Sequence, residues 1–221
     1  MKRKIAVLLV SIACISLFLS GSSPKLIGED EAKKAGLAFI NKVFDANETD
    51  ATVTLESHIG VSYINGEYIA TGEEQPVLFY EVTIPNPKTG GYLYRAEVNA
   101  DTGIAYFASR SFSFVPIMTS EQHQLFQDSI PNGDFSKFDY LRMDEDTKDF
   151  ARDWINNKFD LEAKILGLTD CGSIADNDGA QNSFYVVIRD GTIYYVNIAW
   201  PQLMVIDVAI LNQTRAYEEE P

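Results

Sequence analysis

The feature that most constrains the fold of this chain is an internal repeat of a helical segment. Residues 29–45 and 144–160 align without gaps, and each segment begins with three acidic residues, which favour the positive end of a helix dipole. Apolar residues recur at helical spacing in both, so each helix is predicted to bury one stripe. The positions identical in the two segments are Lys33/Lys148, Ile40/Ile155, Asn41/Asn156, Phe44/Phe159 and Asp45/Asp160.

Each helical segment is followed by stretches in which apolar residues alternate, as they do in strands with one buried face. The repeated order of one helix and about four hairpin-linked strands predicts an α+β fold. We expect two tandem modules, each with one helix packed on an antiparallel sheet of about four strands, rather than one continuous sheet. The predicted strands span 52–64, 78–84, 92–98 and 104–108, with an Asn65-Gly66 hairpin, and then 162–169, 184–189, 192–200 and 203–211.

These patterns divide the chain into five parts. The first 22 residues form a leader, and the first and second modules are predicted at 24–110 and 143–213. A connector at 111–142 is rich in Phe and Tyr and contains a short predicted helix at 120–126, so we expect it to pack between the modules. The acidic tail at 214–221 is expected to be a solvated end.

The amino terminus has the three parts of a secretory signal. A basic start is followed by an apolar run over residues 5–19 and by small residues around Ser20 and Ser22. An uncleaved membrane anchor is an alternative interpretation. Lipidation at Cys14 is a third, although the preceding Ser11-Ile12-Ala13 fits a leucine-led lipobox poorly. All three place the folded part outside the cytoplasm, either secreted or anchored to the outer face of the cytoplasmic membrane.

The charge of the chain excludes two classes of partner. Thirty-two acidic residues against eighteen Lys plus Arg give a net charge of −14, and no basic cluster occurs beyond the leader. Such a surface repels the phosphate backbone of nucleic acids and the headgroups of anionic lipids. We therefore expect no nucleic-acid partner, and membrane contact only through the amino-terminal segment.

The first module, from Ile27 to Ser109, resembles a PepSY domain. The matching residues are Glu31-Ala32-Lys33, Tyr80-Glu-Val82, Tyr94, Val98 and Asp101-Thr-Gly103. The second module is a degenerate copy, because Trp200-Pro201-Gln202 replaces the Thr-Gly turn. The resemblance implies a small secreted or membrane-anchored domain that restrains peptidases or regulates proteins near the cell envelope. That family has no catalytic residues, so none is transferred to this chain.

Few side chains could perform acid–base or nucleophilic chemistry. His58 is predicted to face solvent, His123 lies in the connector, and neither has metal-ligand neighbours at suitable spacing. Cys171 is the one cysteine beyond the leader, and without a basic neighbour it is predicted to be a small, half-buried residue at a strand end. The segment from Asp176 to Gly179, with Asp170 upstream, lacks the ligand spacing of a calcium loop and is expected to be a solvated hairpin. We therefore predict no catalytic, cofactor-binding or metal-binding residues, and no cofactor.

Tyrosines are the remaining candidates for a binding surface. By their alternation, about half should pack beneath the helices, and the others could form an aromatic binding face. The tyrosines considered are Tyr63, Tyr68, Tyr80, Tyr92, Tyr94, Tyr185, Tyr194 and Tyr195.

The sequence thus favours a secreted or envelope-anchored, non-enzymatic binding module with a protein partner, for which the resemblance suggests a secreted peptidase. Open strand edges provide a physical means of binding, because an edge can accept a strand of the partner. Two alternatives remain open at this stage. One is a hydrolase with a cleft between the modules, and the other is a structural envelope protein without a discrete ligand.

Overall fold

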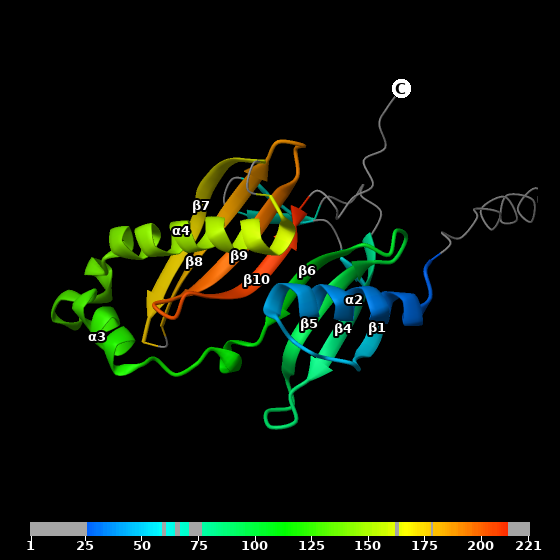
Figure 1. The fold of residues 1–221 in the computed structure, drawn as a ribbon, viewed down its shortest axis with the longest axis horizontal. Coiled ribbons are helices and arrows are strands. Elements are labelled where there is room, and N and C mark those ends of the chain that lie inside the picture. The colour runs from blue at the N-terminus through cyan, green and yellow to red at the C-terminus, as the bar shows by residue number, and fades with distance from the viewer. Residues whose placement is uncertain are drawn as a thin grey trace, which may run out of the picture.

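The computed structural model describes residues 26–58, 61–64, 67–70, 77–161, 164–177 and 179–211 (Figure 1). The leader with Cys14, the Asn65-Gly66 turn, Asp178 and the acidic tail therefore lie outside the described residues. The elements in chain order are α2 (Glu29–Phe44), β1 (Thr52–His58), β2 (Val61–Ile64), β3 (Glu67–Ala70), β4 (Val77–Pro85), β5 (Tyr92–Asn99), β6 (Ala105–Arg110), η1 (Phe112–Phe114), α3 (Ser120–Asp128), η2 (Pro131–Gly133), η3 (Phe135–Lys137), α4 (Tyr140–Phe159), β7 (Ile165–Asp176), β8 (Gly179–Ile188), β9 (Ile193–Trp200) and β10 (Met204–Ile210).

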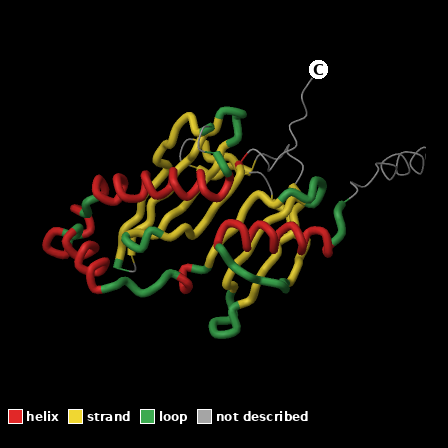
Figure 2. Tube along the Cα trace, in the orientation of Figure 1, coloured by secondary structure: helices red, strands yellow, loops and turns green. Residues whose placement is uncertain are grey.

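Eight of these strands form one antiparallel sheet in the order β1-β4-β5-β6-β10-β9-β8-β7. Helices α2 and α4 lie on the same face of this sheet, α2 over β1, β4, β5 and β6 and α4 over β7, β8 and β9 (Figures 1 and 2). The α+β fold class is thereby confirmed. In each half of the chain a helix precedes four sheet strands that pair in chain order.

The expectation of two separate sheets is wrong. Strands β6 and β10, the last strand of each half, pair at three positions, where Ser109, Ala108 and Phe107 face Asp207, Val208 and Ala209. Each strand would otherwise present a row of unpaired backbone groups, and pairing the two edges satisfies these groups in both halves. The module boundaries at 24–110 and 143–213 stay a prediction.

The strand predicted at 52–64 is divided in the structure. Its first part is β1, which pairs with β4, whereas β2 pairs with β3 in a separate two-stranded sheet. Ile64 lies opposite Glu67, and the predicted Asn65-Gly66 turn between them lies outside the described residues. Leu55 was expected on a buried face but is 44% exposed, because β1 is an edge strand of the large sheet.

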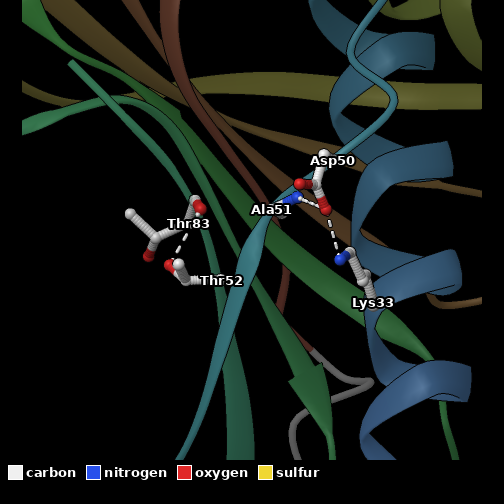
Figure 3. A network of polar contacts seen from close by, with 5 residues as sticks. All are labelled: Lys33, Asp50, Ala51, Thr52 and Thr83. Atoms are coloured by element: carbon white, nitrogen blue, oxygen red, sulfur yellow. Dashed lines mark hydrogen bonds and ion pairs between the residues drawn. The ribbon is translucent and has the colours of Figure 1, made fainter. Parts of the chain in front are cut away.

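The start of β1 is tied to α2 and to β4 by polar contacts (Figure 3). The Lys33 ammonium on α2 forms an ion pair with Asp50, whose carboxylate also accepts a hydrogen bond from the Ala51 amide. The hydrogen bond from Lys33 is the largest influence that lowers the pKa of Asp50. The hydroxyl of Thr52 donates to the carbonyl of Thr83 at 3.1 Å, which aligns β1 with β4.

Strand β7 is longer than the predicted strand at 162–169. It has 12 residues and ends at Asp176, which lies opposite Gly179 at the start of β8. Two register shifts interrupt this pairing, one between Ile165 and Gly167 and one between Asp170 and Gly172. The second half of β7 was not predicted from the sequence, because its polar and glycine residues lack the alternation that identifies a half-buried strand. The predicted hairpin at Asp176 is confirmed by the pairing.

Helix α4 begins at Tyr140, four residues before the repeated segment. Asp139 is its N-cap, and the Asp139 carboxylate accepts a hydrogen bond from the Arg142 amide. The three acids at 144–146 therefore lie in the second turn rather than at the positive end of the helix. One of them, Asp146, instead accepts a hydrogen bond at 2.9 Å from the indole Nε1 of the buried Trp200.

The first part of the connector contacts both halves, since the Ser111 amide donates to the Leu93 carbonyl and Gln202 Nε2 donates to the Pro116 carbonyl. The rest packs against the far end of the second half, not between the modules as expected. Its helix α3, which begins with a capping box at Thr119, continues through η2 and η3 into α4 (Figure 1). Phe126 and Phe138 contact Trp200, with ring centroids 6.4 and 5.8 Å away. These rings belong to a second apolar cluster, separate from the main core beneath the two helices. It covers the parts of α4 and β9 that extend beyond the main core. Its buried members are Phe126, Ile130, Phe138, Met143, Ala180 and Trp200.

The two helices contact each other at their carboxyl-terminal ends. Phe159 of α4 lies 6.5 Å from the ring of Phe39, and the Lys42 ammonium lies 4.6 Å from the centre of the Phe159 ring. Lys158 forms an ion pair with Asp45, the C-cap of α2. The repeated helix ends therefore contact each other across the boundary between the two halves.

We predict that Gly36→Ala destabilises the fold, because α2 packs very closely on β4. A Cβ atom at Gly36 would lie 2.7 Å from Val82 Cβ, too close for any packed side chain. The expected cost is about 1–3 kcal/mol in the free energy of unfolding, measured by urea denaturation. Val82→Ala keeps Val82 Cβ but removes the two Cγ atoms that would lie 2.7 and 2.9 Å from the added Cβ, so it should reduce the effect of Gly36→Ala in part, measured by a double-mutant cycle. The matched control is Gly167→Ala, where no heavy atom lies within 4 Å of the added Cβ.

Candidate functional site

The sheet has a second face that neither α2 nor α4 covers, called here the helix-free face. Tyr80, Tyr94 and Tyr194 belong to the buried core beneath the helices, as alternation predicted for about half of the tyrosines. Tyr185 and Tyr195 lie opposite each other on β8 and β9, and their ring centroids are 6.0 Å apart. Their neighbours along β8 and β9 at even positions are core residues, so this pair lies on the helix-free face. The side chains of Tyr63 and Tyr68 lie outside the described residues.

A row of small and polar residues crosses the helix-free face perpendicular to the strands. Residues directly opposite each other in an antiparallel sheet point to the same face, so the row can be followed from strand to strand. From β7 toward β4 its members are Gly172, Ser183, Asn197, Asp207, Ser109, Arg95 and Thr83.

Hydrogen bonds hold the second-half members of this row in place. Asn197 Nδ2 donates to Gln181 Oε1 and to Asp207 Oδ2, each at 2.9 Å. Ser183 Oγ donates to Asn197 Oδ1 at 3.2 Å and lies 3.2 Å from the Tyr195 hydroxyl. Because Asn197 is only 8% exposed and both ends of its amide are bonded, the floor of this region has a defined arrangement. Burial raises the pKa of Tyr195, so its hydroxyl is neutral at physiological pH.

A hollow with a volume of about 240 Å³ lies above this floor, next to β7. It is open over Gly172, which has no side chain and has no heavy atom within 4 Å of where a Cβ would lie. The backbone at Gly172 has a φ of 154°, a conformation that favours glycine. We call this the Gly172 hollow; its lining residues are Gly172, Ser173, Ile174, Gln181, Ser183, Tyr195 and Asn197.

The outer edge of β7 borders the Gly172 hollow. In the eight-stranded sheet β7 is an outer strand that pairs with β8, and no strand of the described residues pairs with its other edge, called here its open edge. Apolar side chains are exposed along it, with Leu166 at 63% and Ile174 at 65%. Both register shifts lie before Gly172, so pairing is regular from there to Asp176. We call residues 172–176 the β7 edge segment.

Cys171 lies in the middle of β7 at the second register shift, and it is exposed. The prediction of a half-buried residue at a strand end is therefore wrong, because β7 extends seven residues further than expected. Its partial burial, and then the Asp170 carboxylate, raise the pKa of the Cys171 thiol above the usual value, while a hydrogen bond with Tyr185 opposes this. A protonated thiol is a poor nucleophile.

The other sequence candidates do not converge on a site. His123 is exposed on α3, and His58 lies opposite Val77 at the end of β1, its side chain outside the described residues. Within the described ranges, no group of three or more His, Cys, Asp or Glu side chains is arranged to hold a metal ion. In the same ranges, no helix has both the length and the apolar character to cross a membrane.

A second hollow of about 250 Å³ lies between the two halves on the helix-bearing face. Its ionisable lining groups are Asp45, which pairs with Lys158, and Arg110, whose Nη2 donates to the Phe44 carbonyl at 3.2 Å. The other lining residues are Val43, Phe44, Phe150, Trp154, Leu203, Met204 and Val205. Both ionisable groups of this lining are therefore engaged in contacts within the protein.

We predict that Cys171 reacts slowly with iodoacetamide at pH 7.5 despite its exposure, since its raised pKa keeps it protonated. The rate should rise as the pH increases toward the thiol pKa. Asp170→Asn should accelerate the reaction, because it removes a nearby negative charge while keeping the oxygen that accepts from the Gly172 amide at 2.8 Å. Cys14→Ser in all variants limits labelling to one thiol, and Asp153→Asn on α4 is the control. An equal rate in Asp170→Asn and wild type would contradict the electrostatic cause.

Comparisons with known proteins give little information on the family or function of this chain. No family model matches this chain, and no curated protein matches it. Among solved structures, the Bacillus megaterium YpeB C-terminal domain is similar, with a TM-score of 0.44 and 10% sequence identity. The alignment covers 89% of this chain and 69% of that chain. A likeness at this level carries no argument about function, so the PepSY resemblance stays a prediction from the sequence.

Proposed function

We propose that this chain is a non-enzymatic protein-binding module that accepts an extended segment of a partner as an added strand. The observation that carries the proposal is the open outer edge of β7, a strand of 12 residues with exposed apolar side chains. Main-chain hydrogen bonds to such an edge provide affinity, and the side chains on either face provide specificity.

The β7 edge lacks two of the usual protections against strand addition. Natural edge strands are often blocked by Lys or Pro, or shortened, and β7 contains neither residue type. The register shifts do interrupt its first half, as bulges on edge strands commonly do. The regular β7 edge segment is therefore the part that can pair with a partner, and the Gly172 hollow lies directly beside it.

The charge of the chain indicates the chemistry of the partner. The net charge is −14, Asp176 ends the β7 edge segment, and Asp170 lies two residues before it. A basic segment would be attracted to this acidic chain over long range. An extracytoplasmic location and a peptidase partner rest on the leader and on the PepSY resemblance, and both belong to the proposal.

The first prediction of this proposal concerns the edge itself. Dodecapeptides selected from a random display library on the wild-type chain serve as probes. Ile174→Lys places a charge on the β7 edge segment and should lower the affinity for these peptides at least tenfold, as measured by isothermal titration calorimetry. The Ile174 side chain is 65% exposed, so the variant should fold normally.

The matched control is Ile104→Lys between β5 and β6, where the side chain is 42% exposed and β10, β9 and β8 separate β6 from β7 in the sheet. It should bind the same peptides with unchanged affinity. Hydrogen exchange should show slower exchange in residues 172–176 when peptide is bound. Peptides that protect only other segments would contradict the proposal.

A further prediction concerns salt. Association of a basic peptide should slow steeply between 20 and 150 mM NaCl, because long-range attraction to the acidic chain is screened. The dissociation rate should change much less, because backbone pairing is short-range. Stopped-flow fluorescence of a labelled peptide measures both rates, and an association rate independent of salt would contradict a role for the acidic surface.

A further inference from the structure

The Gly172 hollow contains an unused recognition site next to the proposed docking edge. We propose that the partner residue lying opposite Gly172 is a lysine or arginine whose side chain crosses Gly172 and enters the hollow. This inference rests on the proposed function, because it needs a partner strand along the β7 edge segment.

The geometry selects a long side chain. A strand added to β7 would lie about 4.8 Å from it, and the side chain opposite Gly172 would point to the helix-free face. Any side chain at position 172 would block the way toward β8, but glycine leaves this path open. Ser183, which pairs with Gly172, is then the first polar group that the entering side chain meets. A short side chain would end above Gly172 without reaching Ser183.

The chemistry of the hollow selects a cation. Ser183 Oγ and the Tyr195 hydroxyl are oxygens that can accept hydrogen bonds, and no Lys or Arg lines the hollow. The ring of Tyr185, which is 39% exposed, lies beside Tyr195 and can stack on an ammonium or guanidinium group. The Asp207 carboxylate, held by Asn197 two strands beyond Ser183, adds negative potential.

The same features disfavour other side chains. An apolar group would cover the polar floor formed by Ser183, Asn197 and Gln181 and would offer it no hydrogen bonds. A carboxylate would be repelled by Asp207 and by Asp170 and Asp176 on β7. The hollow thus combines attraction for a cation with a penalty against the alternatives, which is how specificity is usually achieved.

The test uses the dodecapeptides selected on the wild-type chain. We expect them to share a Lys or Arg at one position, and replacing it with Met should weaken binding about tenfold, as for loss of a charge-assisted hydrogen bond. In the protein, Tyr185→Leu should weaken the Lys peptide several-fold and leave the Met peptide almost unchanged. Asp207→Asn should act in the same direction, since it removes the charge but keeps an oxygen for Asn197. Asp153→Asn on α4 is the matched control and should change neither affinity.

The outcomes separate this inference from the proposed function. Peptides that slow hydrogen exchange in residues 172–176 but show less than a twofold loss with Met would overturn the basic-residue inference alone. Peptides that leave β7 unprotected would overturn the proposed function and this inference together. A wild-type dimer by light scattering that Ile174→Lys converts to a monomer would assign the edge to a second copy of the chain, and would overturn both.

Discussion

The pairing of β6 with β10 is the contact on which the rest of the architecture depends. Three residue pairs join two four-stranded units edge to edge and bring both helices to the same face. This junction uses one edge of each unit, so the large sheet has only β1 and β7 as its outer strands. The ends of α2 and α4 also contact each other on the helix-bearing face, which supports the same junction. These contacts involve Phe39, Phe159 and Lys158.

Covering one face only gives the two faces of the sheet different roles. Beneath the helices the side chains form one continuous apolar core that extends across both halves. On the helix-free face, polar side chains bond to each other in rows across the strands, as Ser183, Asn197 and Asp207 do. Such a network keeps a polar surface rigid, because each group restricts the orientation of the next. The proposed strand addition would use this rigid polar surface beside the β7 edge.

The irregularities of β7 have two consequences. The register shift at Asp170 and Gly172 interrupts strand pairing, which protects the first half of the edge from nonspecific association. The same shift places Gly172 where a side chain would otherwise close the hollow. One register shift therefore both interrupts the edge of β7 and opens the Gly172 hollow. Neither is visible as a motif, because a bulge depends on pairing with β8 and not on the local sequence of β7 alone.

Local sequence determined the elements of this fold. Helical spacing identified α2 and most of α4, and alternation identified β4, β5, β6, β9, β10 and part of β8, because these patterns follow from the periods of helix and strand. The acids at 144–146 led to a wrong prediction of where α4 begins, because they contact partners such as Trp200 rather than cap the helix. Only the tertiary structure decided that the halves share one sheet and that β7 continues to Asp176. It also decided that most of the connector packs on the second half and that Gly172 opens a hollow. Each of these depends on pairing between residues far apart in the chain, and such pairing leaves no period in the sequence.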